Sequence, residues 1–65
     1  MRVQPLRQVR LERGLTLQAL ADASGVHRVT INRIELRNHQ PALETLWKLA
    51  EALEVSPAEL IERPA

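Results

Sequence analysis

The sequence predicts an all-α fold of five short helices packed around one small core. Apolar residues recur at intervals of three and four along most of the chain, and helix-capping residues and glycines separate these stretches. No segment alternates apolar with polar residues as a half-exposed strand would. The 65 residues leave room for one domain, 1–65. Because the chain has no cysteine, packing of its apolar residues, 45% of the total, must stabilise the fold without disulfides or a thiolate metal site.

Local signals place the first three helices. Pro5 suits the first turn of a helix, and Gly14 is expected to end that helix. Thr16 is a good N-cap for a second helix, which reaches the break at Gly25. The third helix is expected to start near His27 and to run to about residue 36, with two isoleucines turned inward.

Two further helices are expected over about 42–62, after Pro41 closes a loop. The fourth carries an apolar stripe at helical spacing, formed by Leu43, Leu46, Leu49, Ala50 and Leu53. The fifth has the clearest start of all, with Ser56 as N-cap, Pro57 in the first turn and Glu59 completing a capping box. The connections are only a few residues long, which favours a compact arrangement.

The net charge of +1 conceals an asymmetry between the two parts of the chain. Residues 1–40 carry seven arginines against three acidic residues, a net charge of +4, whereas residues 41–65 carry a net charge of −3. Such a split suggests one side that faces a polyanion and another that avoids it. Eight of the nine cations are arginine, which suits bidentate contacts with phosphate and guanine. The alternative is that arginine simply replaces lysine in an arginine-rich background.

The stretch 16–36 has the layout of a helix-turn-helix. Gly25 lies in a tight turn between two short helices, and the apolar Val26 after it can pack back between them. Ala21 is small where the two helices would cross, and Ile31 can fill the space from the second one. This layout holds the second helix where it can enter a major groove of DNA.

The chain resembles the phage repressor and Cro (XRE-type) helix-turn-helix regulators. The matching segments are LRQVRLERGLT at 6–16, LADASGV at 20–26, TINRIE at 30–35 and PALETLWKLAEALEVSPAEL at 41–60. The resemblance implies a five-helix lambda-repressor-like domain that binds operator double-stranded DNA, usually as a dimer. A homodimer on a palindromic operator, with half-sites about 10 bp apart, is therefore expected.

The resemblance also implies roles for individual residues. The expected base contacts are Arg28, Val29, Asn32 and Arg33. Two arginines on guanine and a valine on a thymine methyl would be chemically sound pairings, although solvated arginines are the plain alternative. The expected phosphate contacts are Gln18, His27, Thr30, Arg37, Asn38 and His39.

Arg10 and Glu35 match positions at which the family pairs an arginine with a glutamate, which implies a partly buried ion pair between the first and third helices. Trp47, the one aromatic residue, lies one position off the core stripe of the fourth helix. We interpret it as partial core or, alternatively, as a contact with a dimer or other protein partner. The acidic residues of helices four and five are expected to point away from DNA.

Three positions depart from the family pattern. Leu17 stands where the family usually has a phosphate-binding glutamine, which puts that contact in doubt. His27 replaces the usual Ser or Thr N-cap, and its ring nitrogen can accept a hydrogen bond or face a phosphate. Arg37 replaces a usual glycine, which puts the expected left-handed conformation at that position or at Asn38.

Several function classes are disfavoured. The two histidines and the scattered carboxylates show no metal-ligand spacing or nucleophile–base pattern, so we expect no catalytic residue, no metal and no cofactor. No run of 18 apolar residues and no secretion signal is present, so a cytoplasmic protein without a membrane partner is expected. The alternative function is a protein-binding module, such as an antitoxin that binds a toxin and autoregulates its operon.

Overall fold

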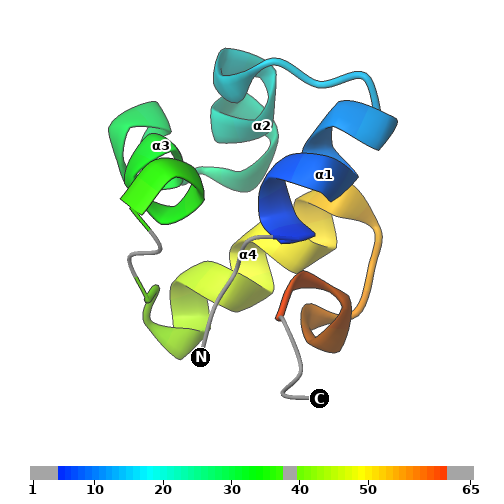
Figure 1. Cartoon of the computed structure of the whole chain (residues 1–65), viewed down its shortest axis with the longest axis vertical. Coiled ribbons are helices and arrows are strands. Elements are labelled where there is room, and N and C mark those ends of the chain that lie inside the picture. The colour runs from blue at the N-terminus through cyan, green and yellow to red at the C-terminus, as the bar shows by residue number, and fades with distance from the viewer. Residues whose placement is uncertain (1–4, 38–39, 62–65) are drawn as a thin grey trace.

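The computed structural model describes residues 5–37 and 40–61 of the chain. Four α-helices follow one another, α1 (Pro5–Glu12), α2 (Leu17–Ser24), α3 (Arg28–Arg37) and α4 (Leu43–Leu53), and a 3₁₀ turn, η1 (Pro57–Leu60), comes after them (Figure 1). The described residues contain no strand, so the predicted all-α class is confirmed.

The fifth helix was predicted in the right place but as the wrong type. Its backbone bonds run from residue i+3 to residue i, from Glu59 N to Ser56 O at 3.0 Å and from Ile61 N to Ala58 O at 3.3 Å. At Ile61 the backbone becomes extended, so the segment ends before α-helical bonds can form. The Glu59 carboxylate still accepts a hydrogen bond of 2.8 Å from the Ser56 backbone amide, as the predicted capping box requires.

The ends of α2 follow the predicted signals. Thr16 Oγ1 accepts a hydrogen bond of 3.0 Å from Ala19 N, which makes Thr16 the N-cap. Gly25 adopts the left-handed conformation, with φ of 76°, and its amide donates to Ala21 O at 2.9 Å. A residue with a Cβ would be strained at this φ, and glycine therefore lets the chain turn sharply from α2 towards α3.

The core takes side chains from every element. Its buried apolar residues are Leu6, Leu20, Ala21, Val26, Ile31, Ile34, Leu46, Leu49, Ala50, Leu53 and Leu60. Helix α2 packs against both α3 and α4, and η1 packs against α4 and α1. Each fully buried leucine or isoleucine contributes about 1.5–3 kcal/mol relative to an exposed one, so this cluster is the main source of stability.

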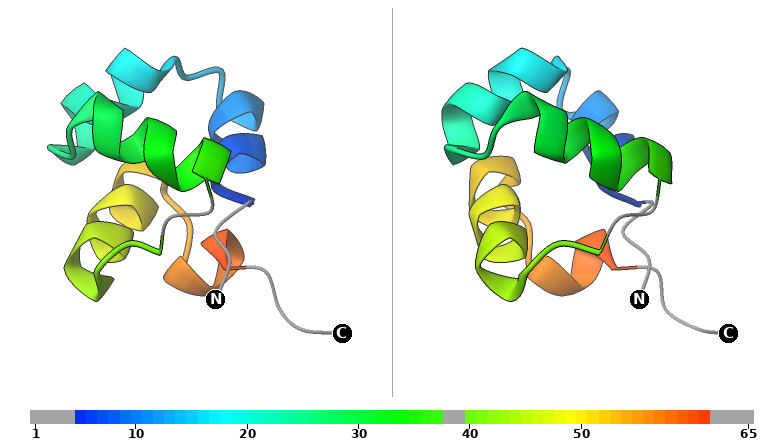
Figure 2. Two further views of the ribbon diagram at one scale, coloured as in Figure 1. Left: turned by 60° about the vertical axis from the view of Figure 1, so that its left-hand side comes forward. Right: turned by 90° about the vertical axis from the view of Figure 1, so that its left-hand side faces the viewer.

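Helix α3 lies at one side of the molecule, on the left in Figure 1, and runs across the front when that side faces the viewer in Figure 2. Val26, in the turn before it, is buried as predicted and fills the corner between α2 and α3. The inner face of α3 is anchored by Ile31 and Ile34, both without exposed surface. Its outer face is therefore held away from the body of the molecule. No helix within the described ranges has the length and apolar character needed to cross a membrane.

Candidate nucleic-acid interface

The outer face of α3 presents four polar or short apolar side chains to solvent. Arg28, Val29, Asn32 and Arg33 are all exposed, and Val29 keeps 44% of its surface accessible. Residues spaced one, four and five apart share one side of an α-helix, so the four side chains form a continuous stripe opposite the buried isoleucines. Thr30 is half-buried beside this stripe. The stripe can reach a partner without any change in the core.

The N-terminus of α3 is capped by a histidine. His27 Nδ1 accepts a hydrogen bond of 3.1 Å from Val29 N, and its carbonyl oxygen accepts one of 3.1 Å from Ile31 N. Because Nδ1 is the acceptor, the neutral ring carries its hydrogen on Nε2 and can donate from that atom. The imidazole thus replaces the usual hydroxyl cap and keeps a donor for another group.

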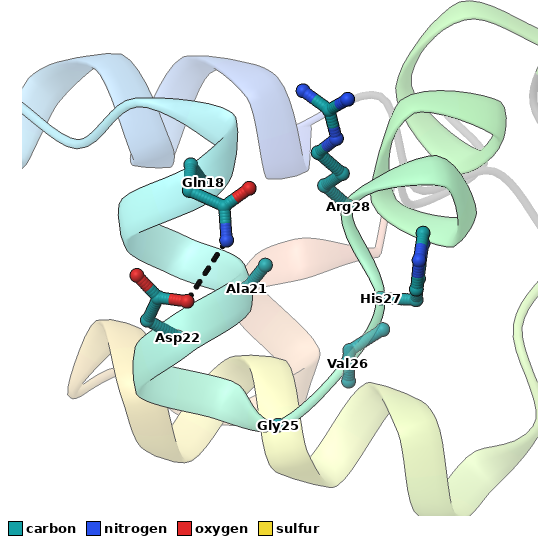
Figure 3. A pocket seen from close by; sticks show the side chains of 7 residues that line it. All are labelled: Gln18, Ala21, Asp22, Gly25, Val26, His27 and Arg28. Atoms are coloured by element: carbon teal, nitrogen blue, oxygen red, sulfur yellow. Dashed lines mark hydrogen bonds between the residues drawn. The ribbon is translucent and has the colours of Figure 1, made fainter.

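An open hollow of about 300 Å³ lies between α2 and the start of α3 (Figure 3). It is lined by Gln18, Ala21, Asp22, Gly25, Val26, His27 and Arg28. Gln18 Nε2 donates a hydrogen bond of 2.9 Å to Asp22 Oδ1 one helical turn away. Sequence reasoning singled out Gln18 but missed Asp22. The signal was available, because an amide and a carboxylate four residues apart face each other on a helix.

The remaining expected phosphate contacts are located only in part. Leu17, which stands in the place of the family's glutamine, is half-buried and packs against the core. That position therefore serves packing in this chain. Arg37 is the last residue of α3, while its side chain, and both Asn38 and His39, lie outside the described residues.

An ion pair joins α1 to α3. Arg10 Nε donates to Glu35 Oε2 at 2.8 Å, and Arg10 Nη2 donates to Glu35 Oε1 at 2.9 Å. The two side chains are only 9% and 3% exposed. The hydrogen bond with Glu35 raises the pKa of Arg10 above its ordinary value; burial opposes this shift, and the Coulombic attraction of Glu35 adds to it. Arg10 therefore remains charged but is not available to DNA.

Exposed carboxylates outnumber cations in the part of the chain that holds α4 and η1. Arg28 and Arg33 are exposed on α3, whereas Glu44, Glu51, Glu54 and Glu59 are exposed in or next to α4 and η1, where Lys48 is the one cation among the described residues. In both views of Figure 2, α4 and η1 lie below α3. No group of three or more potential ligands within 5–37 and 40–61 is placed to hold a metal ion.

Helix α4 also exposes two large apolar side chains. Trp47 is 57% exposed and Leu43 is 69% exposed, and they lie one turn apart on the same side of the helix. Trp47 lies beside the buried stripe of α4 with more than half of its surface exposed, so both interpretations made from the sequence, partial core and partner contact, stay open. Leu36, at the end of α3, is exposed as well.

Comparison with known proteins agrees with this geometry. A sequence model described as helix-turn-helix matches residues 6–60. The chain belongs to the phage repressor/Cro-like (XRE-type) helix-turn-helix family. Members of this family are transcriptional regulators rather than enzymes.

Two similar proteins show the extent of the likeness. The HTH-type transcriptional regulator SutR of Escherichia coli (strain K12) is 39% identical over 59 residues, which is 91% of this chain. The chain spans 33% of the length of SutR. The restriction-modification controller protein C.AhdI from Aeromonas hydrophila is 36% identical and superposes with a TM-score of 0.83, over 89% of this chain and 88% of C.AhdI.

Proposed function

We propose that this chain is a DNA-binding transcriptional regulator that reads an operator by placing the outer face of α3 in the major groove. The observation that carries the proposal is the exposed stripe on α3, with Arg28 and Arg33 one and a half turns apart and the opposite face fixed in the core. Each arginine can donate to O6 and N7 of a guanine, and Val29 can contact a thymine methyl. Asn32 can reach a base or a phosphate through water.

The surrounding groups suit contacts with the DNA backbone. The Nε2–H of His27, the remaining amide hydrogen of Gln18 and the Thr30 hydroxyl border the stripe and can donate to phosphate oxygens. We include Arg37, Asn38 and His39 in this set from the sequence alone. The proposed domain comprises residues 1–65, and the location we propose for it is the cytoplasm.

We further propose a homodimer on a palindromic operator, because two-fold repetition doubles the reading surface of so small a domain. Half-sites would then lie about one helical turn, or 10 bp, apart. Neither the comparisons nor the described residues favour the alternative of a toxin-binding antitoxin.

Selection of bound sequences from a random duplex pool tests the proposal. We expect one enriched motif with two-fold symmetry. Arg28→Ala and Arg33→Ala should each relax the preference at a different position, with a loss of about 1–3 kcal/mol for the preferred base pair. Lys48→Ala, which removes an exposed cation from α4, serves as the matched control and should leave the motif unchanged. Recovery of no enriched sequence by the wild-type chain would overturn the proposal.

A further inference from the structure

The hollow beside Arg28 contains a carboxylate, Asp22, whose role the proposed base and phosphate contacts do not explain. Gln18 and Asp22 lie one turn apart on α2, and Arg28 lines the same hollow from the first position of α3 (Figure 3). A negative charge next to a surface that binds DNA weakens binding to every sequence. We therefore expect the neighbours of Asp22 to show a favourable effect on DNA binding that offsets this loss of affinity.

The hydrogen bond between the two side chains determines which way the Gln18 amide faces. An ionised carboxylate can only accept hydrogen bonds, so the NH₂ group of Gln18 must face Asp22, at 2.9 Å from Oδ1. The amide oxygen then lies on the other side. In Figure 3 this oxygen points towards the part of the hollow that Arg28 occupies.

The three side chains can form a chain of hydrogen bonds in which each donor faces an acceptor, from Arg28 to Gln18 to Asp22. Arg28 has five N–H donors and no acceptor, and a guanine uses only two of these donors. The others remain for an acceptor on the protein, and the Gln18 oxygen is a suitable one on the opposite wall of the hollow.

We propose that Asp22 and Gln18 are positioning residues for Arg28: Asp22 holds the Gln18 amide so that its oxygen accepts a hydrogen bond from the guanidinium while Arg28 reads guanine. The inference rests on the proposed function, since it assigns a guanine to Arg28. An exposed arginine loses rotamer freedom when it binds a base, and a preformed acceptor lessens that loss only in one geometry. Asp22 thus lowers the affinity for DNA of any sequence and increases the discrimination between base pairs.

The test measures a ratio of affinities for two duplexes. One is the selected operator, and the other has the base pair that depends on Arg28 replaced. Gln18→Met removes the acceptor without changing the charge, and this ratio should fall by about 3- to 10-fold. Asp22→Asn should lower the ratio similarly while it raises the affinity for both duplexes, because a negative charge has gone. In an Arg28→Ala background neither substitution should change the ratio.

The chain offers a matched control on α1. Gln8 Nε2 donates to Glu12 Oε1 at 3.2 Å, which is the same pairing of amide and carboxylate four residues apart, away from the hollow. Glu12→Gln should leave the ratio unchanged. Thermal melting of each variant shows whether the fold is intact, and the exposed positions of Gln18 and Asp22 predict that it is.

The outcomes separate the two proposals. If Arg28→Ala leaves every base preference intact, Arg28 reads no guanine, and both the role proposed for it and the present inference are overturned. If Arg28→Ala relaxes one position but Gln18→Met and Asp22→Asn keep the full ratio, the inference alone is overturned. The inference is supported if Gln18→Met and Asp22→Asn each lower the ratio of affinities, and if neither substitution changes this ratio when Arg28 is already replaced by alanine.

Discussion

The guanidinium of Arg10 and the carboxylate of Glu35 meet edge to edge, with parallel hydrogen bonds of 2.8 and 2.9 Å between α1 and α3. The third arm of the guanidinium, Nη1, donates to Leu15 O at 2.8 Å in the connection to α2. No buried side-chain polar atom among the described residues is left without a partner. One arginine thus links α1, the connection that follows it and α3, and it helps to set the orientation of the helix proposed to read DNA.

Arg10→Met should lower the free energy of unfolding by about 3–5 kcal/mol, because it leaves a buried carboxylate without its partner. For a chain of 65 residues this is much of the total stability. Urea unfolding followed by circular dichroism measures the change. The pKa of Arg10 is raised above its ordinary value, so its charged form contributes stability at every pH below that ordinary value, and the contribution is lost as the pH rises through the raised pKa.

A double variant shows how much of the destabilisation in Arg10→Met comes from the unpaired Glu35 carboxylate and how much from the lost packing of the Arg10 side chain. Arg10→Met combined with Glu35→Leu removes both charges and should recover at least half of the loss, because no unpaired charge remains buried; only the Leu15 carbonyl still lacks the donor that Arg10 supplied. The exposed pair of Lys48 and Glu44, 3.6 Å apart, is the comparison, and Lys48→Ala should cost less than about 1 kcal/mol. A loss as small as this in Arg10→Met would contradict the structural role.

Glu54→Gly should stabilise the protein by about 0.5–1 kcal/mol. Glu54 follows α4 with φ of 58°, and it is the one non-glycine residue within the described ranges that has a positive φ. The left-handed conformation costs roughly 1–2 kcal/mol for a residue with a Cβ, and the greater freedom of glycine in the unfolded chain offsets part of the gain. The midpoint of urea unfolding measures the effect.

Two further variants of α4 test the cause. Glu51→Gly, inside the helix, should destabilise by about 1 kcal/mol because glycine is a poor helix former there. Glu54→Lys keeps the Cβ and reverses the charge near the negative end of the helix dipole, so it should give a smaller gain than glycine. Equal gains from lysine and glycine would assign the effect to charge rather than to backbone strain.

His27→Asp should separate stability from DNA affinity. Aspartate is a favoured N-cap, and its charge suits the positive end of the α3 dipole, so the free energy of unfolding should rise by about 0.5–1 kcal/mol. The same charge lies next to the proposed phosphate contacts and should weaken binding to all duplexes alike. His27→Ala loses the acceptor of the 3.1 Å bond from Val29 N and should be less stable than wild type. Unchanged DNA affinity in His27→Asp would place this residue away from the DNA.

The helix boundaries that the sequence predicts well are those decided by neighbouring residues. Thr16 caps α2 and Gly25 ends it as expected, because each signal acts within one turn. The last helix was predicted as α because its capping box resembles that of any helix. Whether such a start continues into an α-helical turn depends on the conformation of the backbone that follows, which becomes extended at Ile61, and the local residues do not specify this conformation.

Features that depend on rotation or on side-chain conformation were harder to predict. Trp47 lies one position from the buried stripe, and one position turns a side chain by about 100°, which is enough to separate core from surface. Nothing at Glu54 predicts a left-handed residue, since glycine or asparagine is the usual signal there. The bond between Gln18 and Asp22 follows from helical spacing, but its relation to Arg28 requires the packing of α2 against α3.

Trp47→Ala should weaken the proposed homodimer by about 10- to 100-fold, since a tryptophan at the centre of an interface contributes about 2 kcal/mol or more. Sedimentation velocity over a range of concentrations measures this. Leu11→Ala, at a residue 56% exposed on α1, is the control for an apolar side chain elsewhere and should leave the dimer unchanged. If the wild-type chain sediments as a monomer at every concentration, or Trp47→Ala sediments as wild type does, this interface is excluded.

Salt provides a second, independent test of the same interface. Glu44 and Glu51 lie one turn to either side of Trp47, so a two-fold contact centred on Trp47 brings like charges together. Screening of that repulsion should strengthen the dimer as salt rises, whereas release of counterions weakens DNA binding under the same change. We therefore expect opposite salt dependences for the two equilibria. A dimer that weakens with salt would contradict a contact dominated by repulsion between these carboxylates.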